Sequence, residues 1–341
     1  MNINKAVLLI NLGTPEKPKK KEVRRYLFEF LNDKRVIDLP WLTRKLLVNS
    51  IIIPFRVGKS TRLYKRLWTA NGSPLLYYLN NLASKLEKRL SAQFHVYKAM
   101  RYGQPSLSDA LKQLKSKQYA SIIIIPLFPQ YASSTTGSII EKVFNVMSKW
   151  EAIPSISIIN QFYKHPDFLE VYAALIMQYN PEQYDHVIFS YHGLPYRQIN
   201  KIHPCRDCQE CTCEKKMPDD GSLCYKATCY ETTRLLAKNT NIPDNKLITG
   251  FQSRLSKNWL SPFTDKIIID LAEKGAKKIL ITAPSFVADC LETIVELEFE
   301  YQNLFKKHGG EKLTLVKSLN DSDNWVACLA NMISKNHQAS K

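Results

Sequence analysis

Short apolar runs alternate with longer stretches of helical periodicity along most of the chain. The apolar runs are rich in β-branched residues and have the length of strands; they occupy residues 6–12, 121–127, 156–159, 186–190, 246–249 and 278–282. The stretches of helical periodicity occupy residues 75–90, 106–115, 138–150, 166–177, 231–237 and 264–274. Alternation of strands and helices predicts parallel sheets that are covered by helices on both faces. The pattern therefore predicts an α/β fold.

Two such sets of elements meet near residues 150–155, which predicts two similar Rossmann-like halves. We expect an N-terminal domain over residues 1–152, a C-terminal domain over 153–312, and an extension over 313–341 that packs back on the N-terminal domain. Ligands of such folds bind beyond the carboxyl ends of the strands. The three loops that follow predicted strands, with the sequences PLFPQYASSTTGS, FSYHGLP and ITAPSFVADCLE, should therefore line one cleft between the halves.

The segment 282–301 predicts a helix with three carboxylates on one face. Glu292, Glu296 and Glu300 stand at positions i, i+4 and i+8, and no Lys or Arg lies between Asp289 and Gln302. Like charges at this spacing destabilise a helix slightly, so stability gives no reason for the arrangement. A ladder of carboxylates can pass a cation or a proton from group to group. The alternative is a solvated acidic face, although the apolar residues between the glutamates leave little of the helix for solvent.

His192 follows a predicted strand directly, and Gly193 and Pro195 fix a tight turn after it. Many single histidines are structural, but one at the mouth of a parallel strand is placed for a site. An imidazole can accept a proton or bind a metal at neutral pH. Glu292, after a second strand, is its natural partner, and such a pair suits proton abstraction or metal delivery.

Composition is that of an ordinary globular protein, with 45% hydrophobic and 23% charged residues among 341. No run reaches the roughly 18 apolar residues of a membrane span, and Gly-Thr-Pro ends the N-terminal apolar stretch too early for a signal peptide. We therefore expect a cytoplasmic protein. The formal net charge of +17 suits nucleic acid, an anionic membrane surface or an acidic small substrate. We expect no nucleic acid, because Lys and Arg are scattered and form no basic-helix or zinc-finger array.

Residues 41–68 mix apolar and basic side chains, which is the composition of an amphipathic lip that rests on an anionic bilayer. The alternative is a buried helix with basic flanks. We expect this segment to be a membrane-facing lip that gives the protein a peripheral association with the membrane.

Six of the eight cysteines fall between residues 205 and 229. Their C-x2-C-x2-C-x-C spacing is typical of a metal site, and a disulfide is not expected in the cytosol. The spacing alone allows Zn²⁺ or an iron–sulfur cluster. At this point both remain open, and the first candidates as ligands are Cys205, Cys208, Cys211 and Cys213, with Cys224 in reserve.

Six segments together resemble the ferrochelatase family, a group of class II chelatases, and in particular its bacterial members with HGLP and QSR segments. In family order and spacing they are NLGTP (11–15), MRYGQPS (100–106), LFPQYASSTTG (127–137), SYHGLP (190–195), GFQSRLSKNWLSPFTD (250–265) and FVADCLETIVELEFEY (286–301). The resemblance implies insertion of Fe²⁺ into a porphyrin, protoporphyrin IX before coproporphyrin, in the last steps of haem synthesis. It also implies a chelatase-like fold with the active site between two halves.

The resemblance assigns roles residue by residue. His192 corresponds to a metal ligand or base, Glu292 to the catalytic glutamate opposite, and Glu296 and Glu300 to an acidic file that brings the iron in or takes protons out. Residues implied to contact the porphyrin are Leu12, Arg101, Tyr102, Phe128, Ser134 and Trp259, with Arg101 and Ser134 at the propionates.

This chain departs from the family pattern at two places. Many members have histidine where it has Cys290, which puts an extra imidazole there in doubt. It also has Ser133 where some members with a [2Fe–2S] cluster have a cysteine, and near the C-terminus it has only Cys328. Other bacterial members have an internal set of cysteines, so the resemblance favours a [2Fe–2S] cluster over structural Zn²⁺ at the cysteines of this chain.

Three other functions would each explain part of the sequence. A sister chelatase that inserts cobalt fits the chemistry but not the six segments. A regulatory haem- or metal-binding protein that has lost catalysis should lack His192 or Glu292, and both are present. A basic zinc-ribbon protein explains the cysteines and the charge but none of the segments at strand ends.

Overall fold

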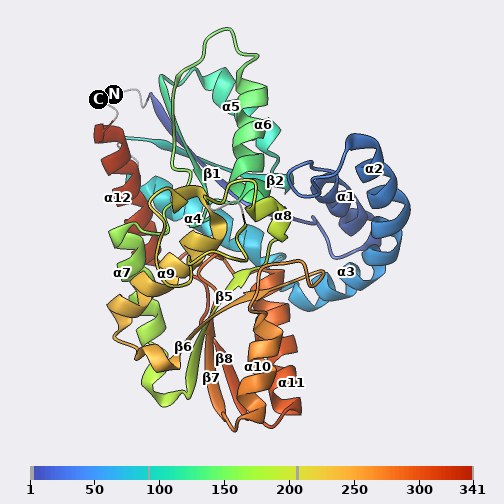
Figure 1. The fold of residues 1–341 in the computed structure, drawn as a ribbon. Helices are drawn as coiled ribbons and strands as arrows, with labels where there is room; N and C mark the ends of the chain where they lie inside the picture. The colour runs from blue at the N-terminus through green and yellow to red at the C-terminus, as the bar shows by residue number, and fades with distance from the viewer. Residues whose placement is uncertain (1–3, 91–92, 205–206, 340–341) are drawn as a thin grey trace. The chain divides into compact units, whose positions relative to one another are not determined.

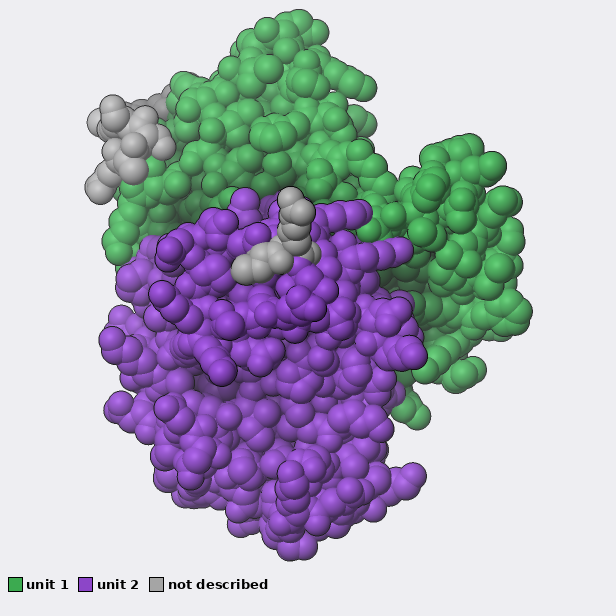
Figure 2. Space-filling model, viewed as in Figure 1, with its two compact units in different colours: residues 1–128, 133–161, 320–341 green, residues 129–132, 162–319 purple. Residues whose placement is uncertain are grey.

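The computed structural model describes residues 4–90, 93–204 and 207–339. The chain forms two compact units (Figure 2). Unit 1 comprises residues 1–128, 133–161 and 320–341, and unit 2 comprises residues 129–132 and 162–319. Each unit contains one parallel four-stranded sheet with helices packed on it (Figure 1).

The sheet of unit 1 has the order β2-β1-β3-β4, and every neighbouring pair is parallel. Its strands are β1 (Lys5–Thr14), β2 (His95–Gly103), β3 (Ser121–Pro126) and β4 (Ser155–Ile158). The helices of this unit are α1 (Lys20–Leu31), α2 (Trp41–Leu46), a π-helix (Leu47–Ile52), α3 (Ile53–Leu67), α4 (Pro74–Leu90), α5 (Leu107–Lys117), a second π-helix (Ser133–Gly137), α6 (Ser138–Met147) and α12 (Asp323–Ala339).

The sheet of unit 2 repeats this topology with the order β6-β5-β7-β8. Its strands are β5 (His186–His192), β6 (Leu247–Gln252), β7 (Lys278–Thr282) and β8 (Lys312–Leu315). Its helices are α7 (Pro166–Met177), α8 (Tyr196–Ile199), α9 (Tyr225–Thr240), α10 (Thr264–Glu273), a π-helix (Leu291–Glu300) and α11 (Tyr301–Lys307), with 3₁₀ turns at Pro181–Gln183, Gly221–Leu223 and Asp244–Lys246. The two similar α/β halves expected from the sequence are confirmed.

Each sheet is buried on both faces, as parallel sheets are. In unit 1, alternate residues of β1 and β3, such as Leu8 and Ile124, pack with α5 and α6. In unit 2, Ile188 and Ile281 pack with α10, α11 and the third π-helix, whose Leu297 is fully buried. The cores therefore fix the ends of β1, β3, β5 and β7, where the segments that resemble the family begin.

The boundaries of the units differ from the divisions at 152/153 and 312/313 that the sequence suggests. β4 begins at Ser155 and pairs with β3, so it continues the first sheet. β8 pairs with β7, so it completes the second sheet, and only residues 320–341 join unit 1. Within unit 1, α12 packs on α4, and Lys85 Nζ contacts the Asp323 carboxylate at 3.0 Å. Among the helices of the described residues, none has both the length and the apolar character that a bilayer span requires.

Candidate active site

His192 is the last residue of β5, and its surroundings fix the direction of its ring. Its Nδ1 lies 2.7 Å from the Gly193 carbonyl oxygen. The Gly193 N–H donates to the carbonyl of Gln252 on β6, and the Tyr225 hydroxyl donates to the His192 carbonyl at 2.9 Å. When the proton is on Nδ1, it is donated to Gly193, and Nε2 keeps its lone pair. The β5 turn thus presents an imidazole as a base or a metal ligand.

Two aromatic rings stand near His192. Trp259 and Phe286 each have their ring centroid 6.4 Å from that of the imidazole. Trp259 is held by a backbone bridge to Pro195, directly after the His192 turn. The structure therefore brings together His192 and one residue that the family resemblance assigns to the porphyrin.

Glu292, Glu296 and Glu300 lie on a π-helix, Leu291–Glu300, and not on an α-helix. A π-helix hydrogen-bonds from i to i+5 and is wound more slowly than an α-helix, so residues four apart lie more nearly above one another. Glu292 and Glu296 are partly buried, whereas Glu300 is exposed. A fully solvated acidic face is thus wrong for the first two residues, and the ladder runs from the interior to the surface.

Glu296 is the best anchored of the three carboxylates. It accepts hydrogen bonds from the Ser253 N–H at 2.8 Å, from the Ser253 hydroxyl, and from the Tyr301 hydroxyl at 3.0 Å. Burial raises the pKa of Glu296 and outweighs these bonds and the nearby His192, while the charge of Glu292 raises it further. Gln252, the partner of His192 in the sheet register, donates from its side-chain amide to the Glu292 carbonyl at 3.4 Å, so the π-helix that carries Glu292 and Glu296 lies close to the end of β5.

A fourth carboxylate on this helix has a different role. Glu298 forms an ion pair with Lys317, whose Nζ lies 2.9 Å from Oε2. The helix begins at Cys290, where the Cys290 side chain accepts from the Thr293 N–H and the Thr293 hydroxyl accepts from the Cys290 N–H. Cys290 thus caps the helix, in line with the absence of an imidazole at that position.

Arg101 on β2 is held by an internal network. Its Nη2 lies 2.5 Å from Asp33 Oδ2, and its Nε donates to the Ser138 hydroxyl at 2.8 Å. The Tyr102 hydroxyl donates to the same Asp33 oxygen at 2.9 Å. Burial acts to raise the pKa of Asp33, but the hydrogen bonds from Ser138 and the Arg35 N–H and the charge of Arg101 outweigh it, so the pKa is lowered. Arg101 is therefore positioned by a permanent carboxylate partner.

The close approach of β1 and β2 at their carboxyl ends requires Gly13. Its φ is +139°, and a Cβ there would lie 2.0 Å from the Tyr102 carbonyl oxygen. In the register of the two strands Gly13 pairs with Tyr102, so Leu12 stands one residue before this pair on β1. Ser134 lies on the π-helix Ser133–Gly137 that follows β3, and Phe128 packs against the core at the end of β3. The five porphyrin residues expected in unit 1 thus all follow strand ends or lie on them.

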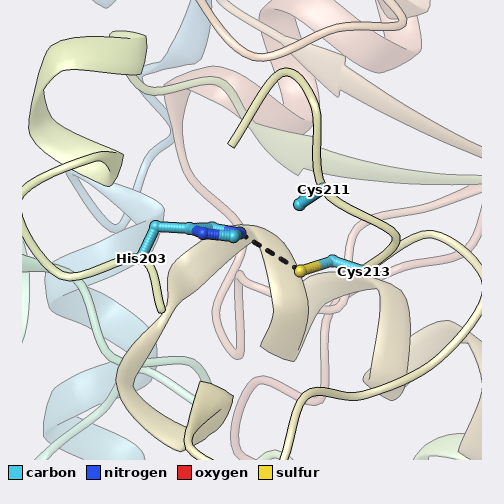
Figure 3. Close-up of side chains that lie close together, drawn as sticks. All are labelled: His203, Cys211 and Cys213. Atoms are coloured by element: carbon cyan, nitrogen blue, oxygen red, sulfur yellow. Dashed lines mark hydrogen bonds between the residues drawn. The ribbon is translucent and has the colours of Figure 1, made fainter. Parts of the chain in front are cut away.

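The cysteine segment, residues 203–224, lies between α8 and α9. It contains one possible metal ligand, His203, that the cysteine spacing does not reveal. His203 Nε2 lies 3.2 Å from Cys213 Sγ, and these atoms and the sulfur of Cys211 all lie within 4.8 Å of one another (Figure 3). Cys208, Cys213 and Cys224 are fully buried. Cys205 lies outside the described residues. Buried soft donors at this separation fit a metal centre.

Two cations of α9 hold the loop of this cysteine segment. Lys226, only 3% exposed, donates to the Cys208 carbonyl at 2.7 Å and pairs with Glu214 at 3.2 Å. Arg234 donates to the carbonyls of Cys213 and Glu214. Burial raises the pKa of the Cys208 thiol to about 12, although Lys226 opposes the change. Without a bound cation, this loop therefore favours the neutral thiol at Cys208.

The lip expected over residues 41–68 comprises α2, a π-helix and α3, next to α1 in unit 1 (Figure 1). Its outer surface is apolar and basic, which makes a wholly buried helix wrong. The exposed apolar residues are Trp41, Leu42, Leu46, Ile51 and Phe55, and the exposed basic residues are Arg56, Lys59, Arg62, Lys65 and Arg66.

Sequence reasoning missed the residues that hold the functional side chains. Ser253 and Tyr301 hold Glu296, Asp33 holds Arg101, and His203 joins the thiols. Ser253 stands in the QSR segment and His203 stands two residues before Cys205, so their positions carried a signal. Asp33 carried none, because its partners are distant in sequence.

Comparisons with known proteins agree with this geometry. The family model described as Ferrochelatase matches residues 4–337. A ferrochelatase of Legionella pneumophila (strain Lens) is 43% identical over 335 residues, covering 98% of this chain and 99% of its own. A ferrochelatase of Coxiella burnetii (strain CbuK_Q154) is 41% identical over 345 residues, covering 99% of this chain and 95% of its own.

Two solved structures share the fold at low sequence identity. SirB from Bacillus subtilis with Fe³⁺ has a TM-score of 0.53 at 11% identity, covering 98% of this chain and 95% of its own. CbiX, the terminal enzyme for biosynthesis of siroheme in denitrifying bacteria, has a TM-score of 0.51 at 13% identity, covering 97% and 98%. These two support the chelatase fold alone. The family match and the full-length relatives go further: this chain belongs to the ferrochelatase family.

Proposed function

We propose that this protein inserts Fe²⁺ into protoporphyrin IX, releases two protons and forms haem. The observation that carries the proposal is that His192 ends β5 close to the π-helix after β7, which carries Glu292 and Glu296 and is bonded to Gln252 and Ser253 at the end of the neighbouring strand β6. Insertion requires a base for two pyrrole protons and ligands that replace the waters of the iron. An imidazole and two interacting carboxylates supply both.

The three glutamates act in sequence in this proposal. Glu300 is exposed and meets hydrated iron or releases protons, Glu296 is held by Ser253 and Tyr301, and Glu292 is partly buried in the first turn of the π-helix. Binding energy from wide apolar contacts with the ring can offset the cost of bending it, a few kcal/mol.

The ring contacts follow from the family resemblance. We propose that Leu12 and Phe128 of unit 1 and Trp259 of unit 2 contact the porphyrin face. Arg101, Tyr102 and Ser134 would meet the propionates. Arg101 Nη1 takes part in none of the bonds to Asp33 and Ser138, so it can bind a carboxylate.

Three further parts of the proposal concern the surroundings of the enzyme. The lip binds an anionic bilayer peripherally, which suits a poorly soluble product. The protein works in the cytoplasm. The cysteine segment holds a [2Fe–2S] cluster, with structural Zn²⁺ as the alternative; the cluster would accept one electron, whereas Zn²⁺ would only order the loop.

An anaerobic assay with Fe²⁺ tests the activity. The variants His192→Ala and Glu292→Gln should lose at least about 99% of iron insertion with the fold retained, since each removes a group that touches the reacting atoms. Glu298→Gln is the matched control, because it lies on the same helix but pairs with Lys317. Wild-type turnover in either of the first two variants contradicts the assignment.

The same assay separates the alternatives for substrate and metal. Protoporphyrin IX, coproporphyrin III and a precorrin-type ring are compared with Fe²⁺ and Co²⁺. We expect the highest kcat/KM for protoporphyrin IX with Fe²⁺. A clear preference for coproporphyrin would correct the ring, and a preference for Co²⁺ with the precorrin-type ring would correct the reaction.

A further inference from the structure

Four donor side chains in the cysteine segment form one connected group. The ligand atoms of His203, Cys211 and Cys213 lie within 4.8 Å of one another (Figure 3). Cys224 is fully buried at the start of α9, and its side chain interacts with that of Cys213. Among the described residues, this group includes an imidazole, and from the regular cysteine spacing it takes the sulfurs of Cys211 and Cys213.

We propose that His203 is a ligand of the metal centre, together with Cys211, Cys213 and Cys224. The inference rests on the metal centre proposed above and changes its composition from four thiolates to three thiolates and one imidazole. Of the set that the spacing suggests, this composition keeps Cys211 and Cys213 and leaves out Cys208, whereas Cys205 lies outside the described residues.

The separations suit closure around metal. Metal–nitrogen and metal–sulfur bonds of about 2.0–2.3 Å place tetrahedral ligand atoms about 3.5–3.8 Å apart. His203 Nε2 lies 3.2 Å from Cys213 Sγ, and the ligand atoms of His203, Cys211 and Cys213 all lie within 4.8 Å of one another. These separations lie on either side of the tetrahedral value, so small side-chain rotations would bring the three atoms to a common metal ion. The backbone N–H of His203 donates to the Ile199 carbonyl at 2.9 Å, which anchors the residue to α8 independently of the cysteines.

Cys208 is held in another way. Its N–H donates to Asn200 Oδ1 at 3.0 Å, and its carbonyl accepts from Lys226 Nζ at 2.7 Å and from the Cys211 thiol at 3.2 Å. The backbone of Cys208 thus shapes the loop, while its sulfur is not among the three ligand atoms that lie within 4.8 Å of one another. We assign it to the wall of the site.

The charge balance agrees with an imidazole ligand. A neutral imidazole in place of a thiolate removes one negative charge from a buried centre. The buried cation beside this segment is Lys226, and it already pairs with Glu214. Fewer uncompensated buried charges cost less free energy. If the centre is an iron–sulfur cluster, the imidazole also shifts its reduction potential to more positive values.

Metal analysis of the anaerobically purified full-length chain tests the assignment. Iron, acid-labile sulfide and zinc per chain are measured for the wild type, His203→Ala, His203→Cys and Cys208→Ser, with His308→Ala as a matched control that pairs with Glu273. We expect His203→Ala to lose at least about tenfold in metal content. Cys208→Ser and His308→Ala should keep the wild-type content.

His203→Cys separates a ligand from a structural residue, because it retains a donor. If the metal is iron, pulsed EPR of the reduced wild type should show ¹⁴N coupling from an imidazole. His203→Cys should keep the iron, lose that coupling and have a more negative potential. If the metal is zinc, exchange for Co²⁺ should give d–d bands that move toward a four-sulfur pattern in His203→Cys.

The outcomes distinguish the two proposals. A metal-free wild type refutes the metal centre itself and the role of His203 with it. A wild type that holds metal, combined with full metal content in His203→Ala or loss of metal in Cys208→Ser, overturns the proposed ligand set and leaves the centre and the chelatase function standing.

Discussion

Phe55 on the lip provides the sharpest test of membrane association, because it is 83% exposed. Full burial of a Phe side chain is worth about 1.5–3 kcal/mol, so transfer of the exposed part into a bilayer contributes about 2 kcal/mol. Phe55→Ala should therefore lower the partition coefficient onto vesicles by roughly 10- to 30-fold. Its stability should change little, since the side chain contributes little to the core.

The assay is flotation with vesicles of phosphatidylcholine and phosphatidylserine. Arg62→Ala in the same helix should lose about 1 kcal/mol of electrostatic attraction at low salt, and this loss should disappear at high salt, whereas the loss from Phe55→Ala should remain. Phe144→Ala is the matched control: this side chain is 52% exposed on α6, outside the lip. Equal losses for the two Phe variants, or none for Phe55→Ala, would refute the reasoning.

Three further predictions concern unit interiors and the glutamate file. Glu300→Gln should raise the KM for Fe²⁺ and leave the KM for porphyrin unchanged; a shift in the porphyrin KM alone contradicts the file. Glu296→Gln should likewise raise the KM for Fe²⁺ and leave the KM for porphyrin unchanged. Burial raises the pKa of Glu296 in the folded protein above its value in the unfolded chain, so the stability that Glu296 contributes is present below the unfolded pKa and is lost as the pH rises through the folded pKa. Glu296→Gln should therefore raise the Tm at pH 8 but not at pH 4. Gly13→Ala should cost about 2–4 kcal/mol of unfolding free energy, measured by urea denaturation, because a Cβ meets the Tyr102 carbonyl at 2.0 Å; a change below about 0.5 kcal/mol would exclude that strain.

The hydrophobic pattern located six of the eight strands in the described residues. The four central strands β1, β3, β5 and β7 are buried on both faces and read as continuous apolar runs, and the edge strands β4 and β6 were found from their β-branched residues. β2 was missed because Lys98 and Arg101 interrupt its apolar residues, as an edge strand permits. β8 was missed because it has only four residues, Lys312–Leu315. α1 and α12 were missed as well, although their buried residues recur at helical spacing.

The candidate site was predictable where residue type and strand end coincide, as at His192. The π-helix was not, because its i+5 hydrogen bonds depend on tertiary contacts, such as those of Glu296 with Ser253, that no local pattern contains. The same reason hid Asp33 and the entry of His203 among the thiols. Contacts between residues that are distant in sequence are determined by the fold, so no local pattern reveals them.

The two sheets have the same topology, which shows how one scaffold carries two kinds of chemistry. In strand order β1 corresponds to β5, β2 to β6 and β3 to β7. Leu12 lies near the carboxyl end of β1, and His192 is the last residue of β5. After β3 and β7 the chain enters a π-helix in each unit, one with small polar residues and one with the carboxylates.

The residues at these equivalent positions differ in charge and in polarity. Unit 1 places an aliphatic residue, a held guanidinium and hydroxyls at its strand ends, which suits the flat apolar face and the anionic edge of a porphyrin. Unit 2 places an imidazole, a serine that holds Glu296 and a file of carboxylates, which suits a divalent cation and protons. Because the two sheets share one strand order, the division between ring binding and metal chemistry in the proposed function would depend on the side chains at the strand ends. Substitutions at strand ends should therefore change activity far more than stability, with Gly13 the exception because its role is in the backbone.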